Sequence, residues 1–141
     1  APREPLHLVI VAAQFGLSTP SVFKQLDAGR ASGLYPASGE LVEPTELLSV
    51  LSSYDGSEAA LTSLAPLLRN DLQAPALSCA PQLEQTLNLR DSEGVYASLV
   101  SGSGPTVLLL TSSQAQAEAL ATSLRATGNH AVSAVTVILY H

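Results

Sequence analysis

Residues 95–111 read VYASLVSGSGPTVLLLT, and this stretch decides the fold. Two aliphatic and β-branched runs, 95–100 and 106–111, flank five residues made only of Ser, Gly and Pro. Such runs joined by a short loop that contains glycine are typical of neighbouring antiparallel strands. The stretch therefore predicts a β-hairpin whose loop runs from Ser101 to Pro105.

The segments on either side extend the hairpin into an α+β order. Downstream, Ser113 with Gln116 forms a capping-box pattern, an apolar stripe follows as far as Gly128, and 131–140 has the composition of a strand. Upstream, 6–13 reads LHLVIVAA, which is typical of a short buried strand. The order predicts a ferredoxin-like split βαβ fold with a four-stranded antiparallel sheet.

The first crossover of this fold is long enough to hold extra helices. Thr19 before Pro20 predicts a helix over 20–28 with Thr19 as its N-cap and Gly29 as its stop. The glycine- and proline-containing stretch 29–44 predicts a long surface loop. Apolar stripes then predict further helices, which we expect to pack on the one sheet, over 45–54, 57–68 and 81–89.

Composition restricts the class of protein. The 141 residues suit one domain, and 46% hydrophobic residues without Trp or Met predict an aliphatic core. A net charge of -6 without a Lys/Arg cluster argues against nucleic-acid binding, and no apolar run approaches a membrane span. The N-terminal residues lack a secretory pattern and Cys79 has no second cysteine, so we expect a cytoplasmic location.

Two segments could bind an anion. Gly102, Ser103 and Gly104 can aim successive N–H groups into one concavity, although a tight hairpin alone would also require the glycines. Ser18 and Thr19 precede a helix N-terminus, where N–H groups and the helix dipole favour negative charge, although a cap alone would also explain Thr19. Each pattern leaves the structural and the ligand-binding interpretations open.

Other polar residues favour structural roles. We expect Asn70 and Asp71 to bond to nearby backbone or to cap a helix. The three histidines, His7, His130 and His141, lie far apart without carboxylate or cysteine neighbours, so no metal site is expected. Neither a nucleophile with a placed base nor a carboxylate pair stands out, and no catalytic residue is assigned.

Three segments taken together resemble the C-terminal half of GHMP kinases. They are FGLST at 15–19, NDLQAPA at 70–76 and VSGSGPTV at 100–107. Within that family the combination is most similar to the kinases that act on 4-diphosphocytidyl-2-C-methyl-D-erythritol. The resemblance covers nearly the whole chain, with Gln73 standing where those kinases usually have Glu.

The resemblance implies a fold, partners and site residues. It implies that 1–141 is the ferredoxin-like C-terminal domain of an ATP- and Mg²⁺-dependent kinase, with neither cofactor bound to this piece alone. Gly102, Ser103 and Gly104 would then line the phosphate-transfer cleft, and Ser18 and Thr19 would face the substrate. The N-terminal ATP-binding domain and its catalytic residues are not in this chain, so we expect the isolated chain to be inactive.

Alternatives remain open at this stage. Another GHMP kinase, of the homoserine or mevalonate type, would carry a similar loop at 101–105. A stand-alone ferredoxin-like module that binds a small ligand is a further alternative, and self-association as a homodimer is also left open.

Overall fold

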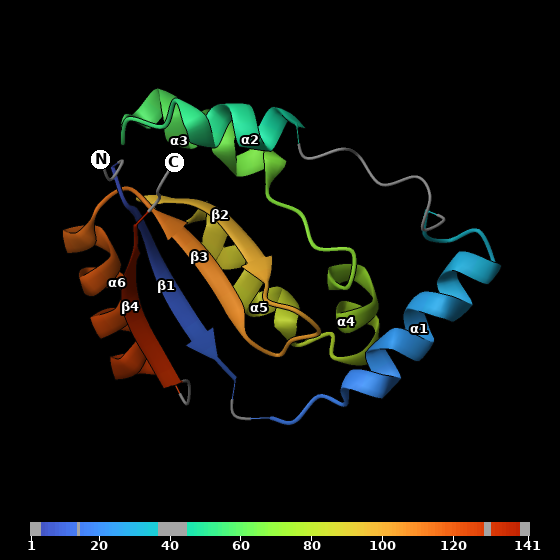
Figure 1. Ribbon diagram of the computed structural model, residues 1–141. Coiled ribbons are helices and arrows are strands. Elements are labelled where there is room, and N and C mark those ends of the chain that lie inside the picture. The colour runs from blue at the N-terminus through green and yellow to red at the C-terminus, as the bar shows by residue number, and fades with distance from the viewer. Residues whose placement is uncertain (1–3, 14, 37–44, 129–130, 139–141) are drawn as a thin grey trace.

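Four antiparallel strands form one sheet at the centre of the computed structural model, which describes residues 4–13, 15–36, 45–128 and 131–138. The spatial order of the strands is β2-β3-β1-β4, and every neighbouring pair is antiparallel. This confirms the ferredoxin-like expectation (Figure 1). The strands are β1 Leu6–Ala12, β2 Val95–Val100, β3 Val107–Thr111 and β4 Ala131–Val137.

Helices fill both crossovers of this topology. A single helix lies between β3 and β4, whereas the first crossover carries all the others. The α-helices are α1 Thr19–Ala31, α2 Thr45–Ser52, α3 Glu58–Leu64, α4 Gln73–Cys79, α5 Leu83–Leu87 and α6 Gln114–Thr127, with short 3-10 turns η2 at Ala65–Leu67 and η3 at Asn88–Asp91.

The sheet is covered on both faces because its side chains alternate. Val9 and Val11 of β1 are buried in a cluster with residues of α4, α5 and α6, whereas Leu8 joins Leu110 in a second cluster with α2 and α3. The inserted helices therefore pack on opposite faces of the sheet. In Figure 1, α2 and α3 lie together across one end of it.

The ends of α1 differ from the expectation. Ser18, rather than Thr19, is the N-cap, because its side chain accepts the N–H of Ser21. Gly29 does not stop the helix but is buried within it, where the Tyr35 ring occupies the space that a Cβ would need. The helix ends at Ala31 instead, and most of the predicted loop, 37–44, lies outside the described residues.

Two further helical features were predicted incompletely. Helix α4 was missed because it is seven residues long and contains Pro75, which is tolerated in the first turn since N–H groups there have no intrahelical partner. In α6, Ser113 accepts the N–H of Gln116 as expected, and Gly128 is the C-cap that follows the last helical residue, Thr127. The Gln116 side chain bonds the carbonyl of Glu93, so only half of the capping box forms.

Candidate functional site

In the glycine-rich turn 101–105 between β2 and β3, two N–H groups have no acceptor among the described residues. Gly102 and Gly104 take positive φ angles of 56° and 81°, which agrees with the expected need for glycine. The N–H of Ser101 bonds the carbonyl of Thr106 at 2.8 Å, and the N–H of Gly104 bonds the carbonyl of Ser101 at 3.0 Å. Within the described part of the chain, the N–H groups of Gly102 and Ser103 have no such partner. These two groups are the donors that an anion could use.

The helix N-terminus predicted as a second anion site lies against this loop. The hydroxyls of Thr19 and Ser103 are 3.0 Å apart, although 84 positions separate them in the sequence. Thr19 is therefore free of the capping role that we expected, since Ser18 performs it. The N-terminus of α1, with the positive end of its helix dipole, therefore lies beside the glycine loop.

Ser18 has a more restricted geometry than Thr19. Its oxygen accepts the N–H of Ser21 at 3.3 Å, which leaves the hydroxyl hydrogen as a donor. The side chain is exposed, so a ligand can still reach that donor. Its role towards a substrate remains a prediction.

Asn70 and Gln73 hold the end of β2 that leads into the loop. The side-chain amide of Asn70 donates to the carbonyls of Val100 at 2.7 Å and Gly102 at 2.6 Å, and its oxygen accepts the N–H of Leu72 at 3.1 Å. The Gln73 side-chain oxygen accepts the N–H of Val100 at 2.9 Å. The expected structural role of Asn70 is confirmed, but it reaches across the fold as well as to nearby backbone. No local sequence pattern indicates the bonds from Asn70 to the carbonyls of Val100 and Gly102.

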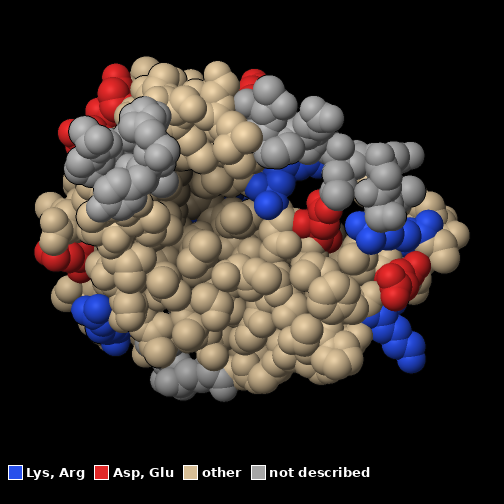
Figure 2. All heavy atoms as spheres, in the orientation of Figure 1, with Lys and Arg blue, Asp and Glu red and all other residues tan. Residues whose placement is uncertain are grey.

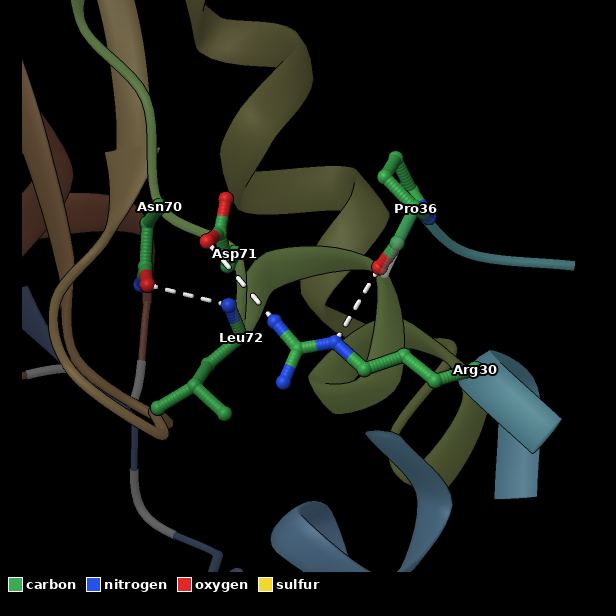
Figure 3. Close-up of polar contacts among 5 residues, drawn as sticks. All are labelled: Arg30, Pro36, Asn70, Asp71 and Leu72. Carbon is green, nitrogen blue, oxygen red and sulfur yellow. Dashed lines mark hydrogen bonds and ion pairs between the residues drawn. The ribbon is translucent and has the colours of Figure 1, made fainter. Parts of the chain in front are cut away.

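The adjacent Asp71 faces the far end of α1. Figure 3 shows its carboxylate directed at Arg30, with an N–O separation of 3.9 Å, while Nε of Arg30 donates to the carbonyl of Pro36 at 3.1 Å. Both charged side chains are partly exposed, at 25% and 44%, so the pair contributes little stability by itself. The 70–73 segment nevertheless contacts α1 on one side and the loop on the other.

Any attraction of this region for anions would come from backbone dipoles rather than from clustered cations. Figure 2 shows a face on which Lys and Arg are sparse and separated, with acidic groups beside several of them. Among the described residues, no group of three potential metal-ligating side chains exists, and His7 contacts Thr136 at 3.3 Å. No described helix is long and apolar enough to cross a membrane.

A shallow cavity of about 320 Å³ lies beside the Asn70 contacts. Its walls combine aliphatic side chains with polar groups from the 68–77 segment and from the edge strand β2. The lining residues are Leu68, Arg69, Asn70, Gln73, Ala74, Leu77, Ser98 and Leu99.

The family follows from a match over most of the described domain. Residues 47–130 match the model of the family described as GHMP kinases C terminal, which includes the glycine loop and the Asn70 segment. The chain belongs to the GHMP kinase family. Residues 18 and 19 of this GHMP kinase domain precede the matched region.

Two similar curated proteins carry the same name. A 4-diphosphocytidyl-2-C-methyl-D-erythritol kinase of Nocardia farcinica is 44% identical over 126 residues, covering 89% of this chain and 38% of the relative. A kinase of the same name from Arthrobacter sp. is 45% identical over 136 residues, covering 96% of this chain and 40% of the relative. The chain thus spans about two fifths of the length of these relatives.

Solved structures share the fold of the domain. A crystal structure of 4-(cytidine 5'-diphospho)-2C-methyl-D-erythritol kinase superposes with a TM-score of 0.65 at 20% identity, covering 98% of this chain and 44% of that one. The L. major mevalonate kinase, solved with R-mevalonate, gives 0.60 at 21% identity, covering 97% and 44%. At such identities the likeness is one of fold, and it agrees with the GHMP kinase assignment.

Proposed function

We propose that this chain is the phosphate-cleft and substrate-binding half of an ATP-dependent kinase that phosphorylates 4-diphosphocytidyl-2-C-methyl-D-erythritol. The substrate is inferred from the relatives that bear this name at 44% and 45% identity. An N-terminal domain absent from this chain would supply the ATP-binding loop and the catalytic residues. The coverage of about two fifths of each relative supports such a division.

The single observation that carries the proposal is the contact of Thr19 with Ser103 at 3.0 Å. It joins two segments that each suit an anion. One is a helix N-terminus, and the other is a glycine loop in which the N–H groups of Gly102 and Ser103 have no acceptor among the described residues. Phosphoryl transfer requires little covalent chemistry from the protein, because positioning and neutralisation of phosphate charge supply most of the catalysis. Preorganised N–H groups at one wall of the cleft suit that task.

ATP and Mg²⁺ fit this half to different degrees. The N–H groups of Gly102 and Ser103 suit phosphate oxygens of ATP, which when bound supplies the transferable γ-phosphoryl group. The described residues contain no group of three or more side chains that could ligate Mg²⁺, and we assign no Mg²⁺ ligand to this half. This half would bind and orient phosphate, and Ser18 and Thr19 would orient the substrate.

A substrate panel tests the proposal. The full-length gene product that contains these residues is expected to transfer phosphate from ATP to 4-diphosphocytidyl-2-C-methyl-D-erythritol, but neither to mevalonate nor to homoserine. Residues 1–141 purified alone are expected to show no transfer. Preference for mevalonate or homoserine would assign another GHMP kinase, and transfer by residues 1–141 alone would refute the division between two domains.

A further inference from the structure

We propose that Asn70 is a positioning residue that fixes the direction of the Gly102–Ser103 peptide unit, an inference that rests on the phosphate-binding role proposed above. The side-chain amide uses both of its N–H donors on carbonyls of the hairpin, at 2.7 Å to Val100 and 2.6 Å to Gly102. Its oxygen accepts the N–H of Leu72 at 3.1 Å, which fixes the orientation of the amide (Figure 3). Asn70 can therefore act only as a donor toward the loop.

Because a peptide unit is planar, the bond from Asn70 to the Gly102 carbonyl also fixes the direction of the Ser103 N–H. The carbonyl of Gly102 and the N–H of Ser103 belong to one peptide unit, in which they point in opposite directions. When Asn70 binds that carbonyl, the N–H of Ser103 must point away from Asn70. This N–H is one of the two loop donors that have no acceptor among the described residues.

The loop needs such a restraint because Gly102 permits the opposite arrangement. Its φ is +56°, and a Cβ at this position would meet nothing within 4 Å, so neither a side chain at Gly102 nor a neighbour beside its Cα restricts rotation about ψ of Gly102. A reversed peptide would present the Gly102 carbonyl where the Ser103 N–H now points. A carbonyl oxygen there would repel a phosphate instead of binding it.

Gln73 secures the base of the same loop. Its side-chain oxygen accepts the N–H of Val100 at 2.9 Å, while Asn70 holds the carbonyl of that residue. Both backbone groups of the last residue of β2 are therefore held by the 70–73 segment, and the loop starts from a fixed point. Because Glu offers the same acceptor, Gln73→Glu should preserve this arrangement, whereas Gln73→Leu should not.

The decisive variants are Asn70→Asp and Asn70→Ala in the full-length protein. The carboxylate of Asn70→Asp keeps the bond to Leu72 but can only accept, so it repels the Gly102 carbonyl and attracts the Ser103 N–H. We expect the peptide to reverse. Asn70→Ala merely releases the peptide. Asp is closer to Asn in shape than Ala is. If Asn70 only filled space, Asn70→Asp would therefore weaken binding less than Asn70→Ala, whereas control of the peptide direction predicts that Asn70→Asp weakens it more.

The experiment measures inorganic tripolyphosphate binding to the ¹⁵N-labelled protein, together with hydrogen exchange of the Ser103 amide. We expect binding to weaken about tenfold in Asn70→Ala and more in Asn70→Asp, since each lost hydrogen bond to a charged group weakens binding by at least that factor. Exchange at Ser103 should slow in Asn70→Asp only. Asn88→Asp, the same change at an exposed position, is the matched control and should alter neither quantity.

Each outcome decides the matter. The inference is overturned if Asn70→Asp binds tripolyphosphate with wild-type affinity. It is also overturned if Asn70→Asp weakens binding less than Asn70→Ala does and leaves Ser103 exchange unchanged. A further outcome is that the wild-type protein fails to bind tripolyphosphate while Ser103 exchange still slows in Asn70→Asp. That result refutes the phosphate-binding role but keeps Asn70 as the residue that orients the peptide. Should Asn70→Asp fail to fold, Asn70→Ala decides: wild-type affinity with intact protection of the Val9 and Val11 amides overturns the inference.

Discussion

Gly102→Ala and Gly104→Ala should lower the free energy of unfolding by different amounts, although the two glycines lie only two residues apart in the same loop. Both positions have positive φ, at 56° for Gly102 and 81° for Gly104, and a side chain in this region costs about 1–2 kcal/mol. At Gly102 a Cβ would meet nothing within 4 Å. We therefore expect Gly102→Ala to lower the free energy of unfolding by about 1–2 kcal/mol.

Gly104 has a second cost, because its surroundings are packed. A Cβ there would lie 3.1 Å from Cδ2 of Leu17, 3.3 Å from Cγ1 of Val100 and 3.7 Å from Cδ1 of Leu83. Overpacking typically adds about 1–3 kcal/mol, and Leu17 is only partly buried, so it can move and keep the cost near the lower end. Gly104→Ala should therefore lower the free energy of unfolding by about 2–4 kcal/mol.

Urea unfolding of the 141-residue chain, followed by tyrosine fluorescence and circular dichroism, measures the difference. With an m-value of about 2 kcal/mol per M, a 2 kcal/mol loss moves the midpoint by about 1 M. The matched control is Gly16→Ala, where φ is not positive and nothing lies within 4 Å, and its effect should stay within about 0.5 kcal/mol. Equal midpoints for Gly102→Ala and Gly104→Ala would refute the packing argument.

Three further predictions concern the site, the core and pH. In a double-mutant cycle on the unfolding free energy, Thr19→Val and Ser103→Ala should show a coupling of about 0.5–1.5 kcal/mol, because the two hydroxyls are 3.0 Å apart. Additive effects would mean that the contact is absent in solution. Leu83→Ala should lower the free energy of unfolding, measured in urea, by about 2–5 kcal/mol, since Leu83 is 1% exposed. Leu48→Ala should lower it far less, because Leu48 is 58% exposed. Similar losses would contradict the assignment of the core. Hydrogen bonds from the side chain and backbone of Ser57 lower the pKa of Asp55, so its contribution to stability is complete above the ordinary Asp pKa and disappears as pH falls through the lowered value. Asp55→Asn should flatten that acidic part of the stability profile, and an unchanged profile would contradict the prediction.

The sheet could be predicted from the sequence because its signals are local. Apolar runs at 6–13, 95–100 and 106–111 lie within one or two residues of the observed strands, and the order of elements gave the topology. Helix ends were predicted less well. Ser18 and Thr19 are both favourable N-caps by residue type, and α1 continues past Gly29, against which the Tyr35 ring packs.

The site depends on contacts that no local pattern contains. Each anion-binding segment could be proposed from its own residues, but the approach of Thr19 to Ser103 spans 84 positions and arises from the folded topology. The role of Asn70 shows the same limit. Its residue type predicted a local backbone bond, which forms with Leu72, whereas the bonds to Val100 and Gly102 depend on how the segment lies against β2.

The most direct test of the phosphate-cleft assignment is a crystal structure of the full-length protein with a non-hydrolysable ATP analogue and 4-diphosphocytidyl-2-C-methyl-D-erythritol. We predict phosphate oxygens at hydrogen-bond distance, about 2.7–3.2 Å, from the backbone nitrogens of Gly102 and Ser103, with the substrate beside Thr19. A phosphate chain bound elsewhere, with the 101–105 loop facing solvent or acting only as a hairpin turn, would contradict the assignment.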